Sequence, residues 1–271
     1  MVFVVKIGET TCKNIINKSG IEGVDYAVNP YIGCAHGCTY CYARFMTRWY
    51  HQGERWGTFV DVKKNALECM KREAPIKKHG VILFSSVTDA YQPVEKETKL
   101  TRSLLQVLSE HDLPVEILTK SSLVKRDLDV LGEFTQSEVG LTIISLDDKV
   151  RRAFEPGASP IHERLEALEL FSDAGIPTYA FLGPLLPHIS DDELEGLLNS
   201  LADKVGRVIV DRLNIKAGNW KTIEETLTAA YPEILPEFKE ASKEDSQYYD
   251  DLRSRVKRLL DERAIPYDIV Y

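Results

Sequence analysis

The sequence of 271 residues predicts an α/β fold with a mainly parallel sheet. Beyond residue 80, short apolar runs alternate with amphipathic stretches, at the roughly 30-residue spacing that is typical of βαβ units. The expected strands are Val81–Phe84, Val115–Leu118, Leu141–Ile144, Thr178–Leu182 and Val208–Val210, preceded by one near Asp25–Val28. Six such strands suit an open doubly wound sheet or a partial barrel, and periodicity alone does not choose between them. In both folds the working site lies at the carboxyl ends of the strands.

Helices are expected between these strands, because apolar residues recur there at helical spacing. The clearest helical patterns are Leu100–Leu108, Ile161–Phe171 and Leu194–Leu201. Gly175 and Pro177 follow the second pattern and form the stop signal expected at the end of a helix.

The two ends of the chain are interpreted as parts of one domain spanning residues 1–271. The opening Met1–Ile7 is apolar but too short for a signal sequence and is expected to be a strand. Residues 219–263 are charge-rich and helical in pattern, and Ile265–Tyr271 is a possible closing strand. No low-complexity linker separates this tail, so we expect a core of about 25–215 and a C-terminal helical extension of about 216–271.

Composition excludes some classes of protein. The formal net charge is −8, so a DNA substrate is possible but not favoured, since neutralising phosphates requires Lys and Arg. No stretch approaches the roughly 18 apolar residues of a membrane-spanning helix. We therefore expect a cytoplasmic protein without a membrane partner.

Three of the five cysteines, Cys34, Cys38 and Cys41, lie within eight positions. In a protein expected to be cytoplasmic, clustered cysteines are more often metal ligands than partners in disulfides. Neighbouring Pro and Gly residues disfavour a regular helix here, and a looped backbone lets the thiolates converge. Thiolates select zinc or iron–sulfur clusters. Zinc would need a fourth ligand, for which His36 and His51 are the candidates, whereas three thiolates on an iron–sulfur cluster leave one iron open for a cofactor or substrate.

The other two cysteines, Cys12 and Cys69, have no partner at ligand spacing in the sequence and are expected to be inert. His36, inside the cluster segment, is expected to order the loop by a hydrogen bond rather than to bind metal.

The pattern Cys-x3-Cys-x-aromatic-Cys, formed by the three cysteines and Tyr40, resembles the signature of the radical SAM superfamily. The surrounding stretch Asn29–Arg44 resembles the subfamily of DNA repair photolyase-like proteins related to spore photoproduct lyase. Further stretches that resemble this subfamily are Thr88–Glu95, Thr119–Ser121 with Arg126–Asp127, Glu155–Pro156 with Arg164, and Pro184–Pro187 with Asp191.

The resemblance implies a [4Fe–4S] cluster on the three cysteines, with S-adenosylmethionine (SAM) chelated by the fourth iron. One electron, from a low-potential donor of the ferredoxin or flavodoxin type, would then cleave SAM to a 5′-deoxyadenosyl radical that abstracts hydrogen from substrate. It also implies a partial (β/α)6 TIM-type barrel with a C-terminal helical extension.

Residues at the expected strand ends are assigned to this chemistry as candidates. Tyr40 is expected against the SAM adenine, and Tyr40 and Tyr42 are available for radical relay. Thr88 and Asp89 are candidates for the SAM amino group, Lys120 for its carboxylate, and Ser145 for its ribose or carboxylate. Glu155 and Arg164 are expected to form an ion pair that orients the site.

One residue departs from the pattern of spore photoproduct lyases. These enzymes carry a hydrogen-donating cysteine three positions before an Asp, and alignment on Asp89 puts Ser86 at that position. A hydroxyl O–H is too strong a bond to replace a thiol donor, so we expect a relative with another substrate. The alternatives that remain are a DNA photoproduct repair lyase-like enzyme and a non-enzymatic zinc or iron–sulfur binding module.

Overall fold

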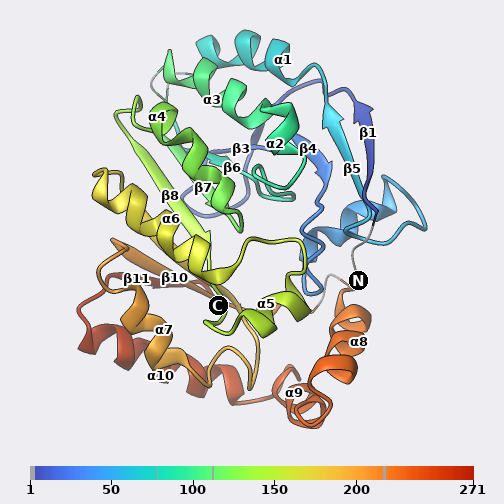
Figure 1. Cartoon of the computed structure of the whole chain (residues 1–271), viewed down its shortest axis with the longest axis vertical. Coiled ribbons are helices and arrows are strands. Elements are labelled where there is room, and N and C mark those ends of the chain that lie inside the picture. Colours follow the sequence, from blue (N-terminus) through green and yellow to red (C-terminus); the bar gives the residue numbers. More distant parts are fainter. Residues whose placement is uncertain (1–3, 78, 112, 216–217) are drawn as a thin grey trace.

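The computed structural model describes residues 4–77, 79–111, 113–215 and 218–271. An eight-stranded sheet forms its centre, in the order β11-β10-β9-β8-β7-β6-β3-β2 (Figure 1). The strands are β2 (Ile16–Lys18), β3 (Tyr26–Val28), β6 (Ile82–Phe84), β7 (Val115–Thr119), β8 (Ser137–Thr142), β9 (Thr178–Leu185), β10 (Arg207–Arg212) and β11 (Tyr267–Ile269). Only the pair β2–β3 is antiparallel among them. The predicted α/β class with a parallel sheet is confirmed, as are all six expected strands, although β8 begins and ends earlier than the apolar run suggested.

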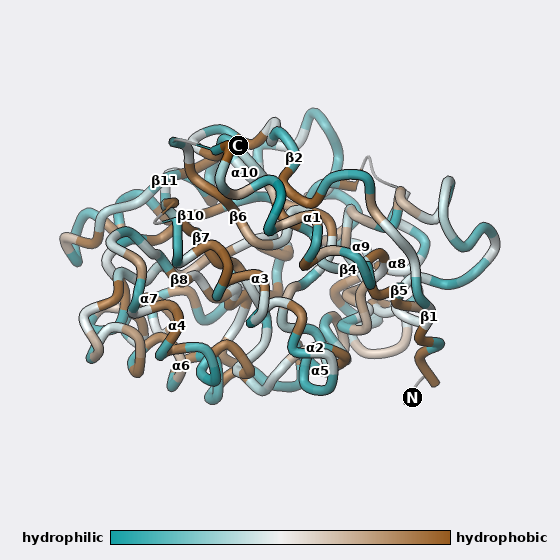
Figure 2. Tube along the Cα trace, turned by 90° about the horizontal axis from the view of Figure 1, so that it is seen from above, coloured by the Kyte–Doolittle hydropathy of each residue, from teal (hydrophilic) through white to brown (hydrophobic). Residues whose placement is uncertain are grey.

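The sheet is open, because β2 and β11 occupy its two edges and the described residues form no pairing between them. Helices cover its apolar face, where the side chains of Ile117, Leu141 and Val208 are fully buried (Figure 1). These helices include α1 (Ala66–Glu73), α3 (Leu100–Ser109), α4 (Leu128–Leu131), α6 (Ile161–Asp173) and α7 (Leu194–Leu201). Figure 2 shows the hydrophobic character of β7, in keeping with a strand that is central to the fold.

The C-terminal end of helix α6 lies where the sequence predicted it. Gly175 adopts a φ of +75°, in the left-handed region that favours glycine. The N–H groups of Gly175 and Ile176 donate to carbonyls in the last turn of α6, at 2.9 Å and 3.0 Å. The predicted stop after residue 174 is therefore confirmed.

The opposite face of the sheet carries polar side chains, and we call it the polar face. Strand alternation puts Glu116 of β7 on this face, together with Glu138 and Thr142 of β8 and Arg207 of β10, and Lys120, the residue after β7, continues the alternation. The Arg207 guanidinium lies 2.6 Å from Glu138 and 3.9 Å from Glu116. Lys120 Nζ donates to Thr142 Oγ1 at 3.4 Å. These contacts across strands show that the side chains share one face.

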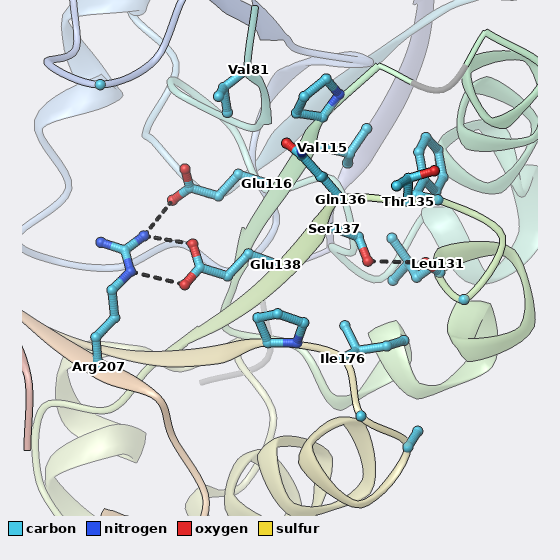
Figure 3. A pocket seen from close by; sticks show the side chains of 17 residues that line it. Val81, Val115, Glu116, Leu131, Thr135, Gln136, Ser137, Glu138, Ile176 and Arg207 are labelled. Carbon is cyan, nitrogen blue, oxygen red and sulfur yellow. Dashed lines mark hydrogen bonds and ion pairs between the residues drawn. The ribbon is translucent and has the colours of Figure 1, made fainter.

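A cavity of about 610 Å³ opens at the amino ends of these strands (Figure 3). Val115, Ser137 and Pro177 line it, and Arg207 reaches across to the two glutamates at its edge. The cavity lies at the opposite end of the sheet from the carboxyl ends, so it is distinct from the expected working site. Its ion pairs join β7, β8 and β10.

A second sheet of three strands, in the order β1-β5-β4, was not predicted as a unit. It consists of β1 (Lys6–Thr10), β5 (Phe59–Lys63) and β4 (Tyr31–Gly33). The expected opening strand is confirmed in part, since β1 begins at Lys6 while residues 1–3 lie outside the described residues. In the sequence, Val62 lies at helical spacing from Ala66, Cys69 and Met70, a pattern that predicts one helix through all four. Val62 belongs to β5, however, because its backbone pairs with both β1 and β4.

The C-terminal region is helical, as expected, and returns to the main sheet. It comprises α8 (Trp220–Ala230), α9 (Leu235–Ala241) and α10 (Tyr248–Glu262), after which β11 pairs in parallel with β10. Leu252, Val256 and Leu259 of α10 are buried. No helix in the described parts of the chain is both long and apolar enough to cross a membrane.

Candidate active site

The segment Cys34–Cys41, which we call the cysteine loop, directly follows β4. It was expected after the first strand of the main sheet, but the short strand β4 intervenes and pairs with β5. Two turns shape the loop: the N–H of Gly37 donates to the carbonyl of Cys34, and the N–H of Cys41 to that of Cys38, both at 3.2 Å. Gly37 has a φ of +62°, a conformation that glycine allows at low cost. As predicted, no regular helix runs through the cysteines, and the 3₁₀ helix Tyr42–Arg48 begins only after them.

The three thiols lie in one electrostatic neighbourhood. Cys34 and Cys38 are buried and Cys41 is half-buried. Burial raises the pKa of the Cys34 thiol, and the nearby Asp89, Cys38 and Cys41 raise this pKa further. Burial likewise raises the pKa values of Cys38 and Cys41, while the ammonium group of Lys120 opposes both shifts. The site therefore gathers three thiols, two of them beside the ammonium group of Lys120.

The arrangement of these donors bears on which metal group fits. Within the described ranges, no three His, Cys, Asp or Glu side chains are placed to share a single metal ion. A bound zinc ion would require each thiolate sulfur to lie about 2.3 Å from the metal. His36 contacts Asp89 at 3.2 Å and His51 lies between Glu54 and Asp61, so both histidines have other partners. Three soft thiolates without a fourth ligand fit an iron–sulfur cluster that keeps one iron open.

Asp89 is a central acceptor beneath the loop. Its carboxylate accepts hydrogen bonds from Thr119 Oγ1 at 2.7 Å and from the backbone N–H groups of Tyr91 and Lys120 at 2.8 Å and 2.9 Å. Burial alone would raise the pKa of Asp89, but His36 and these donors outweigh burial and hold the pKa far below its usual range. Asp89 thus links the loop to the carboxyl end of β7. His36 Nδ1 lies 3.2 Å from Asp89 Oδ2 but forms no hydrogen bond, so the loop-ordering hydrogen bond expected of His36 stays a prediction.

Gln92 holds the backbone on both sides of Cys34, a role that sequence reasoning missed. Its Oε1 accepts from the N–H of Ala35 at 2.8 Å, and its Nε2 donates to the carbonyl of Gly33 at 3.3 Å. Thr88 Oγ1 donates to the same carbonyl at 2.6 Å and accepts from Gln92 Nε2 at 3.0 Å. Gln92 is fully buried. A signal existed, since Gln92 belongs to the stretch Thr88–Glu95 that carries the family resemblance.

The expected ion pair between Glu155 and Arg164 is confirmed. Arg164 Nη2 lies 2.6 Å from Glu155 Oε2, and both side chains are fully buried. The Tyr40 hydroxyl donates to the other carboxylate oxygen of Glu155. Burial alone would raise the pKa of Glu155, but Arg164, Lys120 and Tyr40 lower it on balance. The pair therefore reaches the cysteine loop through Tyr40.

The loop is also held by the backbone on either side of Glu155 and by side chains at the start of α8. The N–H of Thr39 donates to the carbonyl of Phe154 at 2.8 Å, and the N–H of Gly157 donates to the carbonyl of His36 at 2.9 Å. From the start of α8, Asn219 Nδ2 donates to the carbonyl of Tyr40 and Thr222 Oγ1 to that of Thr39. The C-terminal extension thus packs directly against the loop.

Lys120 and Ser145 lie at the ends of adjacent strands, as expected. Lys120 Nζ is 5.9 Å from the centre of the Tyr40 ring. Burial alone would lower the pKa of Lys120, but Cys38, Glu155 and Asp89 raise it, so the side chain stays cationic. Ser145 is buried, and its Oγ accepts from the N–H of Asp147 at 3.0 Å.

Tyr42 lies on the outer side of Cys41 and is 44% exposed. Its hydroxyl donates to the carbonyl of Ser86. Asn29 Oδ1 fixes this segment by accepting from the N–H groups of Ser86 and Val87, both at 3.0 Å. The structure therefore brings together Tyr42 and Ser86, two positions that the sequence had singled out separately.

The chain belongs to the radical SAM superfamily, whose family model matches residues 28–201. It is an enzyme of the radical SAM class. It is 36% identical to an uncharacterized protein of Methanocaldococcus jannaschii over 94% of both chains. It is also 25% identical, over 64% of its length and 36% of the relative's, to the radical SAM Nalpha-GlyT isomerase of Pseudomonas phage M6.

Solved structures show the same fold at low sequence identity. A variant of spore photoproduct lyase aligns with a TM-score of 0.74 at 16% identity, over 98% of this chain and 81% of that one. Streptococcus suis SuiB bound to its precursor peptide SuiA aligns with a TM-score of 0.63 at 13% identity, over 100% of this chain and 50% of that one. Identities this low establish similarity of fold alone.

Proposed function

We propose that the protein holds a [4Fe–4S] cluster on Cys34, Cys38 and Cys41 and reductively cleaves SAM bound at the fourth iron. The observation that carries this proposal is the set of three thiols, without a fourth ligand, beside the ammonium group of Lys120. When bound, this pair of cofactors supplies a 5′-deoxyadenosyl radical that abstracts hydrogen from a substrate still to be identified. The open parallel sheet would act as a partial (β/α)6 barrel with the cofactors over its carboxyl ends.

In this proposal the chain's own contribution is to hold the loop and to balance charge. Gln92 and Thr88 fix the peptide groups around Cys34, and Asp89 fixes the end of β7. Lys120 compensates the negative charge of the thiolates and is the residue we assign to the SAM carboxylate. Its location beside two of the thiols supports this role.

The other SAM contacts remain predictions. Ser145 is assigned to the ribose or carboxylate, and Thr88 and Asp89 to the amino group. Thr88 already donates to the carbonyl of Gly33, just before the loop, and Asp89 already accepts from the N–H of Tyr91. Tyr40 is assigned to the adenine, with its hydroxyl held by Glu155. Arg164 would act on the site through Glu155, because its guanidinium is fully buried.

We assign the relay of the radical to Tyr42 rather than Tyr40, although both were candidates. The Tyr40 hydroxyl donates to a buried carboxylate, whereas Tyr42 is half-exposed and contacts the backbone of Ser86. Because a serine hydroxyl cannot replace a thiol hydrogen donor, Tyr42 is the residue near this position with a suitable O–H bond.

The reductant would be a low-potential protein of the ferredoxin or flavodoxin type, acting in the cytoplasm. The five cysteines are free, a state that persists in a reducing compartment.

A nucleotide-containing substrate is the second candidate, because aromatic rings continue outward from the cysteine loop. Tyr42 stacks near Phe45 at 6.5 Å, and Phe45 meets Trp49 edge-on at 5.7 Å. Trp49 is 66% exposed, and Arg48 beside it is also exposed. Exposed rings beside arginine are suited to stacking on bases. Spore photoproduct lyase, a structural neighbour, has been solved with a dinucleoside spore photoproduct, and the net charge of −8 weighs against long nucleic acids.

The test is anaerobic reconstitution with iron and sulfide, reduction with dithionite, and measurement of 5′-deoxyadenosine formed from SAM. We expect product from the wild type and none from Cys38→Ala, which should also lose bound iron. Cys69→Ala is the matched control, because Cys69 lies outside the loop, and it should keep both iron and cleavage. An intact cluster that forms no 5′-deoxyadenosine would refute the enzymatic proposal, and bound zinc with no iron would favour the binding-module alternative. Oligonucleotide binding by the wild type that disappears in Trp49→Ala would support the nucleotide substrate.

A further inference from the structure

Cys12 and Cys69 face each other outside the proposed active site, a contact that no spacing in the sequence indicated. Their Sγ atoms are 3.9 Å apart although 57 positions separate them in the sequence. Cys12 follows β1 and is half-buried, whereas Cys69 lies in α1 and is only 2% exposed. The two thiols are therefore in contact, and one of them can be reached from solvent.

The backbone around the pair is held independently of the sulfur atoms. The side-chain amide of Asn65, just before α1, accepts from the N–H of Cys12 and donates to its carbonyl, both at 2.8 Å. The N–H of Lys64 donates to the carbonyl of Thr10 at 3.0 Å, next to the parallel pairing of β1 with β5. Contact between the thiols therefore does not depend on movement of either segment, and a bond between them requires only rotation of the side chains.

We propose that Cys12 and Cys69 form a second thiol site, a dithiol that a small-molecule disulfide such as glutathione disulfide oxidises to an intramolecular disulfide. The Cys12 thiolate attacks one sulfur of the oxidant and releases one glutathione thiol, which leaves a mixed disulfide on Cys12. The Cys69 thiolate then attacks the Cys12 sulfur and releases the second glutathione thiol. The two cysteines lose two electrons and two protons, and the oxidant gains them.

The direction of attack follows from exposure, and its pH dependence follows from the surroundings. Burial and the neighbouring Cys69 raise the pKa of Cys12 to about 11; Glu73 of α1 adds to the shift and Lys63 of β5 opposes it. The reacting thiolate is thus scarce at neutral pH. At pH values below this pKa, the rate of attack by Cys12 should rise about tenfold for each unit by which the pH increases.

The cross-link would close a loop that contains the whole cysteine loop. It would join the end of β1 to α1 without using any proposed cluster ligand. A disulfide across so long a segment restricts the unfolded chain, so the oxidised protein should melt at a higher temperature.

Peptide mapping tests the proposal, because trypsin separates the two kinds of cysteine. Cys12 lies on Ile7–Lys13, Cys69 on Asn65–Lys71, and the three loop cysteines together on Ser19–Arg44. The full-length protein with its reconstituted cluster is treated anaerobically with glutathione disulfide between pH 7 and 9, alkylated and digested. We expect Ile7–Lys13 joined to Asn65–Lys71, about a hundredfold faster at the upper pH, and a higher melting temperature.

Two matched variants define the order of attack. Cys69→Ser should stop at a glutathione adduct on Cys12, and Cys12→Ser should leave Cys69 unmodified, because it is buried. Both variants should keep bound iron. The proposal fails if both thiols stay open to alkylation, if either joins a cysteine of Ser19–Arg44, or if Cys69 reacts first. Because the readout is the linked peptides, it stands even if the protein does not cleave SAM.

Discussion

Replacing Glu155 by glutamine should destabilise the protein strongly, although the two side chains have nearly the same shape. The carboxylate accepts from the Tyr40 hydroxyl on one oxygen and pairs with Arg164 at 2.6 Å on the other. The introduced amide could still accept from Tyr40. Its N–H group, however, would face the N–H groups of the guanidinium, so Arg164 would remain buried with an unpaired charge.

The size of the effect follows from burial. Breaking a fully buried ion pair by removing one partner costs about 3–5 kcal/mol, because the remaining charge keeps its desolvation penalty. A chain of this size shifts its melting temperature by roughly 2 °C for each kcal/mol, so Glu155→Gln should melt about 6–10 °C below the wild type. The matched control is Glu166→Gln on the same helix as Arg164. Glu166 is 60% exposed in a 3.4 Å pair with Lys125, and such pairs contribute about 1 kcal/mol at most.

Melting followed by far-ultraviolet circular dichroism is the assay. Adding Arg164→Met to Glu155→Gln should recover part of the lost stability, because the unpaired charge is then gone. A drop no larger than that of the Glu166→Gln control, or a double variant that is less stable than the single one, would refute the argument.

The same carboxylate sets a pH dependence with a definite sign. The pKa of Glu155 is lowered in the folded protein, so its stabilising contribution is complete above the unfolded pKa of about 4.3 and is lost as pH falls through the folded value. Glu155→Gln should therefore show a weaker loss of stability between neutral and acidic pH than the wild type does.

Three further predictions test other parts of the structure. Gly157→Ala would place a methyl carbon 2.3 Å from the carbonyl oxygen of Ala35 and should reduce bound iron. The control is Gly196→Ala within α7, where the nearest atom would lie 3.9 Å from the added methyl carbon. This variant should bind iron normally and gain up to about 1 kcal/mol of stability. Gln92→Leu leaves the N–H of Ala35 without its acceptor and removes one of the two donors to the carbonyl of Gly33, so it should cost about 1–3 kcal/mol and lower the iron content after reconstitution. Normal iron content would argue against the role of Gln92. The pKa of His51 is raised because hydrogen bonds to two carboxylates outweigh burial. Its contribution to the stability of the folded protein is therefore complete below the unfolded pKa of about 6.5 and is lost as pH rises through the folded value. His51→Gln should weaken this decrease when the melting temperature is measured as a function of pH.

The parallel sheet could be predicted because its signal is local. Each of the six expected strands is a short apolar run, and the helices between them carry clear apolar faces. The three-stranded sheet was missed because its pairing is not local: β4 and β5 lie on opposite sides of the cysteine loop, and each is only three to five residues long. Val62 is an example: its helical spacing to Ala66 runs across the end of β5 and the turn before α1, so the spacing does not indicate a helix.

The cysteines and the Glu155–Arg164 pair were also found from the sequence, through the family motif. The contact between Cys12 and Cys69 was not, because no local pattern relates two residues 57 positions apart. For the same reason Asn219 and Thr222 were read as part of a charge-rich tail, although both donate to carbonyls of the cysteine loop. The sequence therefore did not predict which distant segments contact the cysteine loop.

These segments decide how the loop obtains its shape. Groups from three regions hold it: Gln92 and Asp89 in the segment after β6, the segment Phe154–Gly157, and Asn219 just before α8. Asp89 contacts the His36 side chain, and the others bind the loop backbone. A structural zinc finger takes its folding energy from the metal and unfolds without it. In this protein the protein scaffold holds the peptide groups instead, so the folded structure should survive loss of the cluster. A preformed loop would also explain how three thiols could suffice for the proposed cluster, because the scaffold, and not a fourth protein ligand, would then set the geometry around the open iron.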